Sequence, residues 1–382
     1  MHVLHVTPYF APAFRYGGPP RTILGLCTAL RAAGVDVEVV TTAANGDAPL
    51  PASGADGDVY DGIRVHYAAP AFPRRYFGAA LDGPLRSALQ RADVCHIHGI
   101  WNAPEWLASK RARDARKPYV ISTRGMLLPA AAARNRWRKA VMFGWVERRN
   151  LTGAARLHST SPEETASLDA IVNRDRIVEI PNGVDVCAAG PRRSGVRARL
   201  GIPEDAPVVL FLGRIHPIKR LDLLASAVAR VRERDAGVHL VIAGPDEGSH
   251  LSTLAPFIAP LGSSVHVIGA VDEEKWQLLA ESTLLAMTSD SESFGMSVVE
   301  AMAAGVPVVV ARTCGWSTID ADGCGVLVDQ RADAIAAGIE RVLRDRAAAT
   351  AMGARGARLA RERFDWRVIA GRMIACYESV LG

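Results

Sequence analysis

The sequence predicts an α/β protein made of two doubly wound domains. Short runs of β-branched residues alternate with segments of helical periodicity along the whole chain, which is typical of parallel sheets covered by helices. The 382 residues are too many for one ordinary core, and they suit two domains of about 150–200 residues each. Hydrophobic residues make up 49% of the chain and charged residues 22%, so both domains can bury substantial cores.

The first domain is expected over residues 1–185. A β-branched run at 3–7 predicts the first strand, and residues 21–33 carry apolar side chains at helical spacing before Gly34, which suits a helix end. Further strands are predicted at 35–39, 94–98 and 119–123. The stretch 43–61 is rich in Gly, Ala, Asp and Pro, and we interpret it as a surface loop.

The second domain is expected over residues 186–364, after the turn that Pro-Asn-Gly predicts at 181–183. Its predicted strands are 208–212, 238–243, 265–268, 284–287 and 307–310, with a helix at 221–234. A last helical segment at 365–382 either completes this domain or crosses back to the first. Periodicity alone does not decide between the two.

Composition excludes several classes of protein. The net charge of +5 is too small to indicate nucleic acid as a partner, although it suits an anionic ligand or an acidic lipid surface. The six cysteines have no zinc-binding spacing, so we expect reduced thiols and no metal. The first eight residues lack the basic start of a signal peptide, and no run of about 18 apolar residues occurs. We therefore expect a cytoplasmic protein without a membrane span.

The strongest chemical signal is the segment 290–307, which follows a predicted strand and opens a helix. The amides at the start of this helix form a potential anion site, at Phe294, Gly295, Met296 and Ser297. Glu292 precedes the helix and Glu300 lies two turns along it, so the two carboxylates can bracket a sugar and a ribose. The alternative for Glu300 is an exposed glutamate on an amphipathic helix.

Two cations follow the strand at 208–212. Arg214 and Lys219 leave the strand end five positions apart and are expected to converge on a diphosphate, where two cations stabilise an oxyanion. The alternative for Lys219 is a solvated lysine in the first turn of a helix.

In the first domain, His98 ends a predicted strand, while His96 is expected to face elsewhere. Gly17 and Gly18 precede a helix and can present backbone amides, although Gly-Gly-Pro is also common in plain loops. The first strand is not followed by G-x-G-x-x-G, which argues against a nicotinamide dehydrogenase.

These motifs resemble those of glycosyltransferase family 4, whose members are retaining enzymes with the GT-B fold, two Rossmann-like domains facing each other across a cleft. The segment 290–307 resembles the family's E-x7-E motif, and 211–222 resembles its strand–Gly-Arg-Leu–x–Pro–x–Lys–Gly segment. The strand and glycine loop at 241–248, with Gly244, the turn at 181–185 and the loop at 16–20 also match, in order. Arg220 departs from the family pattern, since many relatives have Gly there.

The resemblance implies a donor site. Arg214 and Lys219 would stabilise the leaving nucleoside diphosphate in place of a metal, and Gly17 and Gly18 would lie near the distal phosphate and the sugar. Gly244 and the helix start at 294–297 would contact the donor. The resemblance implies no cofactor and no metal, and a UDP-linked or GDP-linked sugar as donor.

The resemblance also assigns the sugar contacts. His98 would face the transferred sugar, Glu292 would bind sugar hydroxyls and Glu300 the nucleotide ribose. Transfer would retain the anomeric configuration by a same-face mechanism, in which the leaving phosphate takes the acceptor proton. The implied acceptor is a glycan or a lipid-linked glycan in cell-surface polysaccharide synthesis.

Two other functions stay open at this point. One is a GT-B enzyme that does not transfer, such as a nucleotide-sugar epimerase or a hydrolase. The other is a silent nucleotide-sugar-binding or scaffold protein, against which the complete set of Arg214, Lys219, Glu292 and Glu300 argues.

A separate feature is the basic segment 134–149. Trp137, Val141 and Trp145 recur at helical spacing, and the segment's net charge of +5 equals that of the whole chain. Such a helix suits peripheral contact with an anionic bilayer at the inner face of a membrane, near a lipid-linked acceptor. The alternatives are a core-packed helix with a solvated basic face, and a site for an acceptor phosphate.

Overall fold

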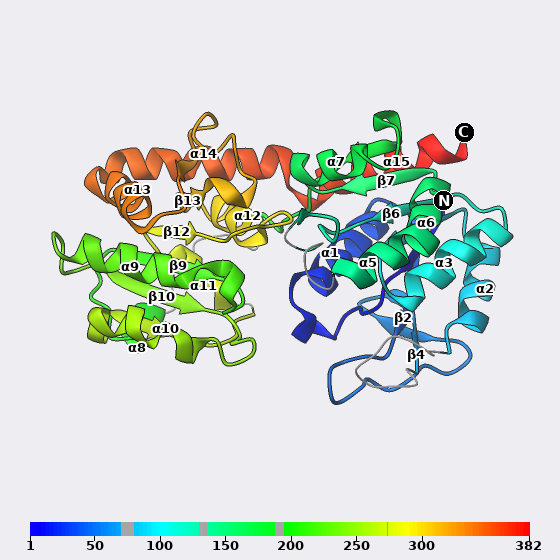
Figure 1. Ribbon diagram of the computed structural model, residues 1–382, viewed down its shortest axis with the longest axis horizontal. Coiled ribbons are helices and arrows are strands. Elements are labelled where there is room, and N and C mark those ends of the chain that lie inside the picture. Colours follow the sequence, from blue (N-terminus) through cyan, green and yellow to red (C-terminus); the bar gives the residue numbers. More distant parts are fainter. Residues whose placement is uncertain (70–79, 130, 132–135, 188–194, 273) are drawn as a thin grey trace. The chain divides into compact units, whose positions relative to one another are not determined.

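The chain folds into two compact units in the computed structural model (Figure 1). The structure describes all residues except 70–79, 130, 132–135, 188–194 and 273. Unit 1 comprises Met1–Gly183 together with Trp366–Gly382, and unit 2 comprises Val184–Asp365. The last helix, whose place the sequence left open, therefore belongs to the first unit.

Unit 1 is built on a sheet with the strand order β3-β4-β2-β1-β5-β6-β7-β8, in which only the edge strand β3 is antiparallel. The strands are β1 (His2–Val6), β2 (Asp36–Thr42), β3 (Asp58–Tyr60), β4 (Ile63–Ala68), β5 (Val94–His98), β6 (Tyr119–Ser122), β7 (Arg156–Ser159) and β8 (Ile177–Glu179). Strand β3 lies inside the segment that we interpreted as a loop. Asp61 and Gly62 both have positive φ, so they close a tight hairpin there.

Two layers of helices cover this sheet. One layer holds α1 (Gly18–Ala32) and α15 (Trp366–Leu381), and the other holds α2 (Asp82–Arg91), α3 (Ala103–Asp114), α6 (Arg148–Gly153) and α7 (Pro162–Asp169). Trp366 fits against α1 because Gly25 has no side chain: a Cβ there would lie 2.4 Å from the indole. Helix α5 (Arg136–Met142) and a π-helical turn, η2 (Phe143–Glu147), precede α6.

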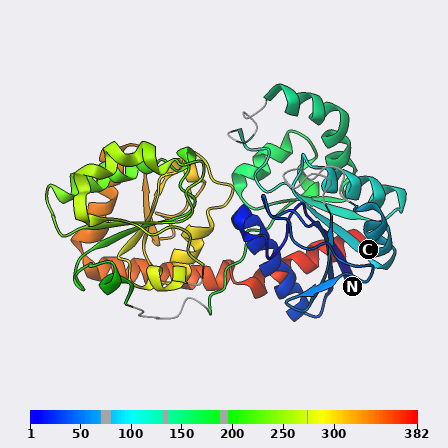
Figure 2. The ribbon, with the colours of Figure 1, turned by 90° about the horizontal axis from the view of Figure 1, so that it is seen from below.

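Unit 2 contains a fully parallel sheet with the order β11-β10-β9-β12-β13-β14. Its strands are β9 (Val208–Leu212), β10 (His239–Ala243), β11 (Val265–Val267), β12 (Leu284–Met287), β13 (Val308–Ala311) and β14 (Gly325–Val328). Helices cover both faces, as Figure 2 shows. They are α8 (Val196–Arg199), α9 (Leu221–Arg232), α10 (Leu251–Ile258), α11 (Glu274–Ala280), α12 (Met296–Ala303), α13 (Ala332–Arg344) and α14 (Arg346–Arg363).

Each sheet reverses its winding direction once. In unit 1 the chain winds outward from β1 to β2 and β4, and then returns to place β5 on the other side of β1. In unit 2 the reversal lies between β9 and β12. Ligands of doubly wound sheets bind at the carboxyl ends of the strands beside such a reversal. The loops that follow β5, β9 and β12 are therefore the first places to look for a site.

None of the helices in the described part of the chain combines the length and the apolar character that crossing a bilayer requires.

Candidate active site

In unit 2, the reversal point brings Lys219 and Glu292 together across 73 positions of sequence. Lys219 ends a short 3-10 turn after β9, and its Nζ forms an ion pair with Oε1 of Glu292, in the loop after β12. Their side chains are only 14% and 11% exposed. The alternative of a solvated Lys219 is therefore wrong.

One hydroxyl group connects the two loops that carry this pair, and a second holds Glu292 within its own loop. Thr288 donates from Oγ1 to the carbonyl oxygen of Lys219 at 3.0 Å, and Ser289 donates from Oγ to Oε1 of Glu292 at 2.6 Å. Both residues are fully buried. Because the carboxylate is held from two sides, Glu292 has a fixed position at the carboxyl edge of the sheet.

Arg220 follows the pair and adopts a left-handed conformation, with φ of 52°. That conformation explains why glycine suits this position, since a side chain is disfavoured there. The guanidinium forms ion pairs with Asp222 at 3.0 Å and Asp290 at 3.3 Å. These ion pairs stabilise the turn with arginine at this position.

Helix α12 begins directly beside Glu292. Gly295 caps it with φ of 76°, and Met296 and Ser297 occupy its first turn. The first-turn amides of a helix have no intrahelical acceptor, so this end can bind an anion. Phe294 is buried against Trp316, whose Nε1 donates to its carbonyl oxygen at 2.8 Å. The Phe294 ring therefore serves packing, and only its backbone is available to a ligand.

Glu300 lies further along α12 and is 9% exposed. Its Oε1 pairs with Nζ of Lys275 at 2.5 Å, in α11. The alternative of an exposed surface glutamate is therefore wrong. A carboxylate in such an ion pair still has lone pairs that can accept hydrogen bonds from hydroxyl groups such as those of a ribose.

Arg214 and Gly244 have other surroundings. Arg214 forms an ion pair with Glu247, in the loop after β10, and is about half exposed. Its predicted convergence with Lys219 on a diphosphate stays a prediction. Gly244 has φ of 148°, and a Cβ there would lie 1.8 Å from the carbonyl oxygen of Gly213. The loops after β9 and β10 can approach only because this residue is glycine.

In unit 1, His98 is buried at the end of β5, where two neighbours bind its ring. Nη2 of Arg124 lies 2.9 Å from His98 Nδ1, and His98 Nε2 lies 2.8 Å from Nδ1 of His5. Since a guanidinium only donates, His98 carries its proton on Nε2 and donates it to His5. Burial lowers the pKa of His98 well below its usual range, so the ring is neutral at pH 7.

A second chain of hydrogen bonds runs through His96. Distances of 2.6–2.7 Å link Tyr377 OH to His96 Nδ1, His96 Nε2 to Ser122 Oγ, Ser122 Oγ to His158 Nδ1, and His158 Nε2 to the carbonyl oxygen of Ile180. Because the carbonyl oxygen of Ile180 can only accept, the donor of each preceding hydrogen bond in the chain is determined. Each donated proton points in the direction from Tyr377 towards Ile180. Our expectation that His96 faces away from His98 was wrong, because residues two apart in a strand share a face.

Ring nitrogens of His5, His96 and His98 all lie within 4.8 Å of one another, which is close enough for a shared metal ion. Hydrogen bonds already explain why the ring nitrogens of His5 and His98 lie so close together. The facing atoms of His5 and His98 share one proton, and Arg124 occupies the remaining nitrogen of His98. The expectation that no metal binds stays a prediction.

Gly17 and Gly18 begin α1 in unit 1. Gly17 caps the helix with φ of 85°, which requires glycine. Gly18 has no heavy atom within 4 Å of where a Cβ would lie, so there is open space beside it. This geometry is compatible with amides that face a ligand.

The described part of the basic segment 134–149 forms α5, η2 and the start of α6, and it places apolar side chains in solvent. Trp137 is 73% exposed, Val141 57% and Trp145 85%. The core-packed alternative is therefore wrong for these three residues. Arg134 and the side chains of Arg136 and Arg138 lie outside the described residues.

This helical segment lies against the loop that follows His98. Glu147 accepts a hydrogen bond from the Trp101 amide at 2.6 Å, and the Lys139 ammonium lies 5.8 Å from the centre of the Trp101 ring. The helical segment that carries the exposed tryptophans therefore lies next to the loop after β5, the strand that ends at His98.

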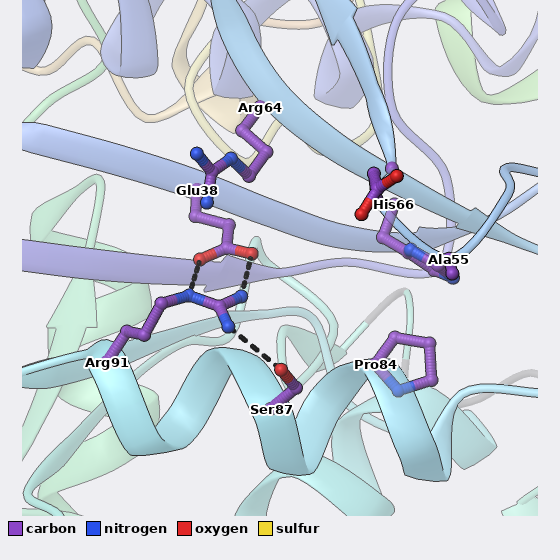
Figure 3. A pocket seen from close by; sticks show the side chains of 9 residues that line it. Glu38, Ala55, Arg64, His66, Pro84, Ser87 and Arg91 are labelled. Atoms are coloured by element: carbon purple, nitrogen blue, oxygen red, sulfur yellow. Dashed lines mark hydrogen bonds and ion pairs between the residues drawn. The ribbon is translucent and has the colours of Figure 1, made fainter.

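A polar pocket lies elsewhere in unit 1, between β2, β4 and α2 (Figure 3). Arg91 binds both carboxylate oxygens of Glu38, at 2.6 and 3.3 Å, and donates to Ser87 at 2.8 Å. Glu38 lies near the start of β2 and Arg64 near the start of β4, away from the carboxyl edge of the sheet. The pocket is therefore separate from the residues at that edge.

Sequence reasoning missed Arg124, His5, Ser289 and the pairing role of Lys275. None of them stands in a local motif, and only the topology brings them to the strand ends. For His5 a weak signal existed: a histidine inside the first β-branched run.

Comparison with known proteins matches this architecture. A family model described as "Glycosyl transferase 4-like domain" matches residues 17–183, and one described as "Glycosyl transferases group 1" matches 193–359. Anabaena HepE, solved in complex with UDP-glucose, is 21% identical with a TM-score of 0.78, over 99% of this chain and 100% of that one. A sucrose-phosphate synthase from Thermosynechococcus elongatus is 22% identical with a TM-score of 0.75, over 99% and 98%. The fold is thus that of the GT-B glycosyltransferases.

Curated relatives are closer in sequence. The D-inositol 3-phosphate glycosyltransferase of Kineococcus radiotolerans is 30% identical over 417 residues, covering 99% of this chain and 94% of the relative. That of a Nocardioides species is 31% identical over 426 residues, covering 98% and 88%. The chain belongs to glycosyltransferase family 4 and is a transferase that uses a nucleotide-sugar donor.

Proposed function

We propose that this enzyme transfers a hexose from a UDP-sugar with retention of configuration and without a divalent cation. The observation that carries the proposal is the Lys219–Glu292 pair beside the start of α12. UDP is the preferred donor base because HepE, a protein of the same fold, was solved with UDP-glucose. A GDP-sugar is the alternative.

The pair has a specific role in this mechanism. Without donor, Lys219 and Glu292 neutralise each other. The diphosphate of the donor competes for the ammonium, while the α12 amides face its remaining oxygens. Glu292, still held by Ser289, then accepts hydrogen bonds from sugar hydroxyls. When the bond to the sugar breaks, the negative charge that develops on the diphosphate is stabilised by groups already in place.

Retention follows if the acceptor hydroxyl attacks on the face that the diphosphate leaves. The C1–O bond to the phosphate breaks, the C1–O bond to the acceptor forms, and a phosphate oxygen takes the acceptor's proton. No protein base is then needed. This suits His98, whose lowered pKa and engaged ring nitrogens make it a poor proton carrier.

For the acceptor we propose a phosphorylated molecule, lipid-linked in cell-surface polysaccharide synthesis. The curated relatives are D-inositol 3-phosphate glycosyltransferases, which favours a phosphorylated acceptor, an inositol phosphate. Trp137, Val141 and Trp145 favour a lipid-linked one, because two exposed indoles in a basic helix suit the interface of an anionic bilayer. We further propose that this helix makes peripheral contact with the membrane surface.

Acceptor-dependent chemistry tests the function. UDP-glucose is incubated with the enzyme alone, with inositol 3-phosphate, and with a membrane extract containing lipid-linked glycans, and UDP release is recorded. The proposal predicts release that depends on an acceptor and a product with the donor's anomeric configuration by NMR. Release without acceptor would identify a hydrolase, and scrambling of the donor sugar an epimerase.

Liposome sedimentation tests the membrane contact. The double variant Trp137→Ser/Trp145→Ser should lose binding to vesicles containing phosphatidylglycerol, whereas Val59→Ser should keep it. Val59 is the matched control because it is 74% exposed in the same unit but lies on β3. Equal binding by both variants would refute the contact.

A further inference from the structure

Arg124 is a cation at the carboxyl edge of unit 1 that the proposed chemistry does not use. Arg124 lies two residues after β6 and has a φ of 54°, in the left-handed region. From this turn its side chain contacts residues at the ends of other elements. Nη1 donates to Asn182 Oδ1 at 2.9 Å and to Thr22 Oγ1 at 3.3 Å, and Nη2 donates to His98 Nδ1 at 2.9 Å. These partners come from the segment after β8, the second turn of α1 and the end of β5.

All three partners of Arg124 are neutral. The largest favourable charge interaction of Arg124 is with the carboxylate of Glu164, whose oxygens accept hydrogen bonds from other groups. Glu164 accepts hydrogen bonds from the Thr123 hydroxyl, the Gly125 amide, and both the amide and the hydroxyl of Thr160. Among the residues that the structure describes, no carboxylate forms an ion pair with Arg124.

The guanidinium is also incompletely satisfied. Its Nε atom is buried and has no hydrogen-bond acceptor in the described structure. Burial lowers the pKa of Arg124 to about 10, which still leaves it charged at neutral pH. A partly buried guanidinium with no direct ion pair and an unsatisfied Nε atom is costly in a folded protein, so this place favours an additional anion.

The groups around Arg124 do not supply that anion. Apart from Glu164, burial lowers the pKa of each nearby histidine (His5, His96, His98 and His158) and raises the pKa of Cys27 and Tyr377, so these six side chains are neutral at pH 7. Thr22, the fifth residue of the 15-residue helix α1, brings Arg124 near the amino end of that helix, which favours negative charge. Beside Gly18, the first residue of that helix, there is open space.

We propose that Arg124 binds an anionic group of a substrate, a phosphate or a carboxylate, at the carboxyl edge of unit 1. The inference rests on the proposed function for the identity of that substrate. The group belongs either to a phosphorylated acceptor or to the diphosphate of the donor. Both present the same oxyanion chemistry to a guanidinium.

A purely architectural role is the competing explanation, in which Arg124 only holds His98 and Asn182. Three variants separate the two. Arg124→Gln removes the charge and keeps an N–H donor, Arg124→Lys keeps the charge, and Arg113→Gln is the matched control. Arg113 also lies in unit 1 and donates only to neutral groups, Tyr119 OH and Asn150 Oδ1, both at 3.0 Å.

The readout is the ring-nitrogen NMR signal of His98 in the full chain labelled with ¹⁵N-histidine, identified by its loss in His98→Gln. Inorganic phosphate, inositol 3-phosphate and UDP-glucose are titrated separately. We expect a saturable shift of the His98 signal with at least one of them, in the wild type and in Arg113→Gln. Arg124→Gln should weaken that response at least tenfold, and Arg124→Lys less.

A response to phosphate or inositol phosphate assigns the site to the acceptor, and one to UDP-glucose alone assigns it to the donor. The proposal is overturned if His98 responds to none of the three, or if folded Arg124→Gln responds like the wild type. The signals of His96 and His158 report whether the variant has folded. UDP binding that depends on Lys219 tests the proposed function separately, so either idea can fail while the other stands.

Discussion

Acidifying the full chain from pH 7 to pH 5.5 should destabilise unit 1 much more than unit 2. Burial lowers the pKa of His5 to about 3 and that of His158 to about 4, whereas in an unfolded chain both return to about 6.5. Below pH 6.5 these two histidines therefore bind protons in the unfolded chain but stay neutral in the folded unit. The stability these neutral rings provide is present above pH 6.5 and is lost as the pH falls towards their folded pKa values.

The size of the effect follows from that linkage. Between pH 7 and pH 5.5 each of the two histidines removes about 1.2 kcal/mol, so the pair removes about 2.5 kcal/mol. His96 and His98 act in the same direction, since burial also places their pKa values well below the usual range. Domains are typically stable by about 5–15 kcal/mol, so a loss of this size is easily measured.

Amide hydrogen exchange measured at several pH values can resolve the two units. The free energy of opening should fall by at least about 2 kcal/mol for the amides of β1 and β5, after correction for intrinsic exchange rates. Strand β9 of unit 2 is the internal control, because none of the histidines described in that unit is fully buried. Equal changes in the two units, or no change in β1 and β5, would refute the assignment of neutral buried rings.

Three further predictions concern single residues. Lys219→Ala and Glu292→Gln should each lower the transfer rate by about 10²–10³, with unfolding temperatures within a few degrees of the wild type; rates within a factor of three would contradict their role. Gly244→Ala should cost about 1–3 kcal/mol in urea denaturation, because its Cβ meets the Gly213 carbonyl, whereas Gly371→Ala, with no heavy atom within 4 Å, should not destabilise. Tyr377→Phe removes the donor to His96 and should cost about 1–3 kcal/mol by the same assay; an unchanged midpoint would rule out that hydrogen-bond chain.

The sequence predicts the strands that lie next to the winding reversals best. Strands β5, β9 and β12 have the predicted bounds: β9 and β12 are apolar runs with clear ends, and β5, Val-Cys-His-Ile-His, lies between Asp93 and Gly99. Strand β7 was missed because its Arg-Leu-His-Ser sequence carries no β-branched residue, and β8 because it has only three residues. Pairing with neighbours, which local sequence does not encode, makes these segments strands.

The residues of the candidate site also differ in how well the sequence predicts them. Lys219 and Glu292 could be predicted because each stands in a long motif, although their direct ion pair could not. Arg124 has no such signal, since an arginine after a strand is ordinary in isolation. Its importance arises from Thr22, His98 and Asn182, which lie far apart in sequence and meet only through the order of the strands.

Calorimetric titration with UDP in the presence of EDTA tests the central claim most directly, namely that amino-acid side chains and helix amides replace a metal at the diphosphate. The account predicts that the wild type binds UDP with all divalent ions chelated, and that Lys219→Ala weakens binding at least tenfold. Binding that appears only after magnesium is added, or that is unchanged in Lys219→Ala, would contradict it.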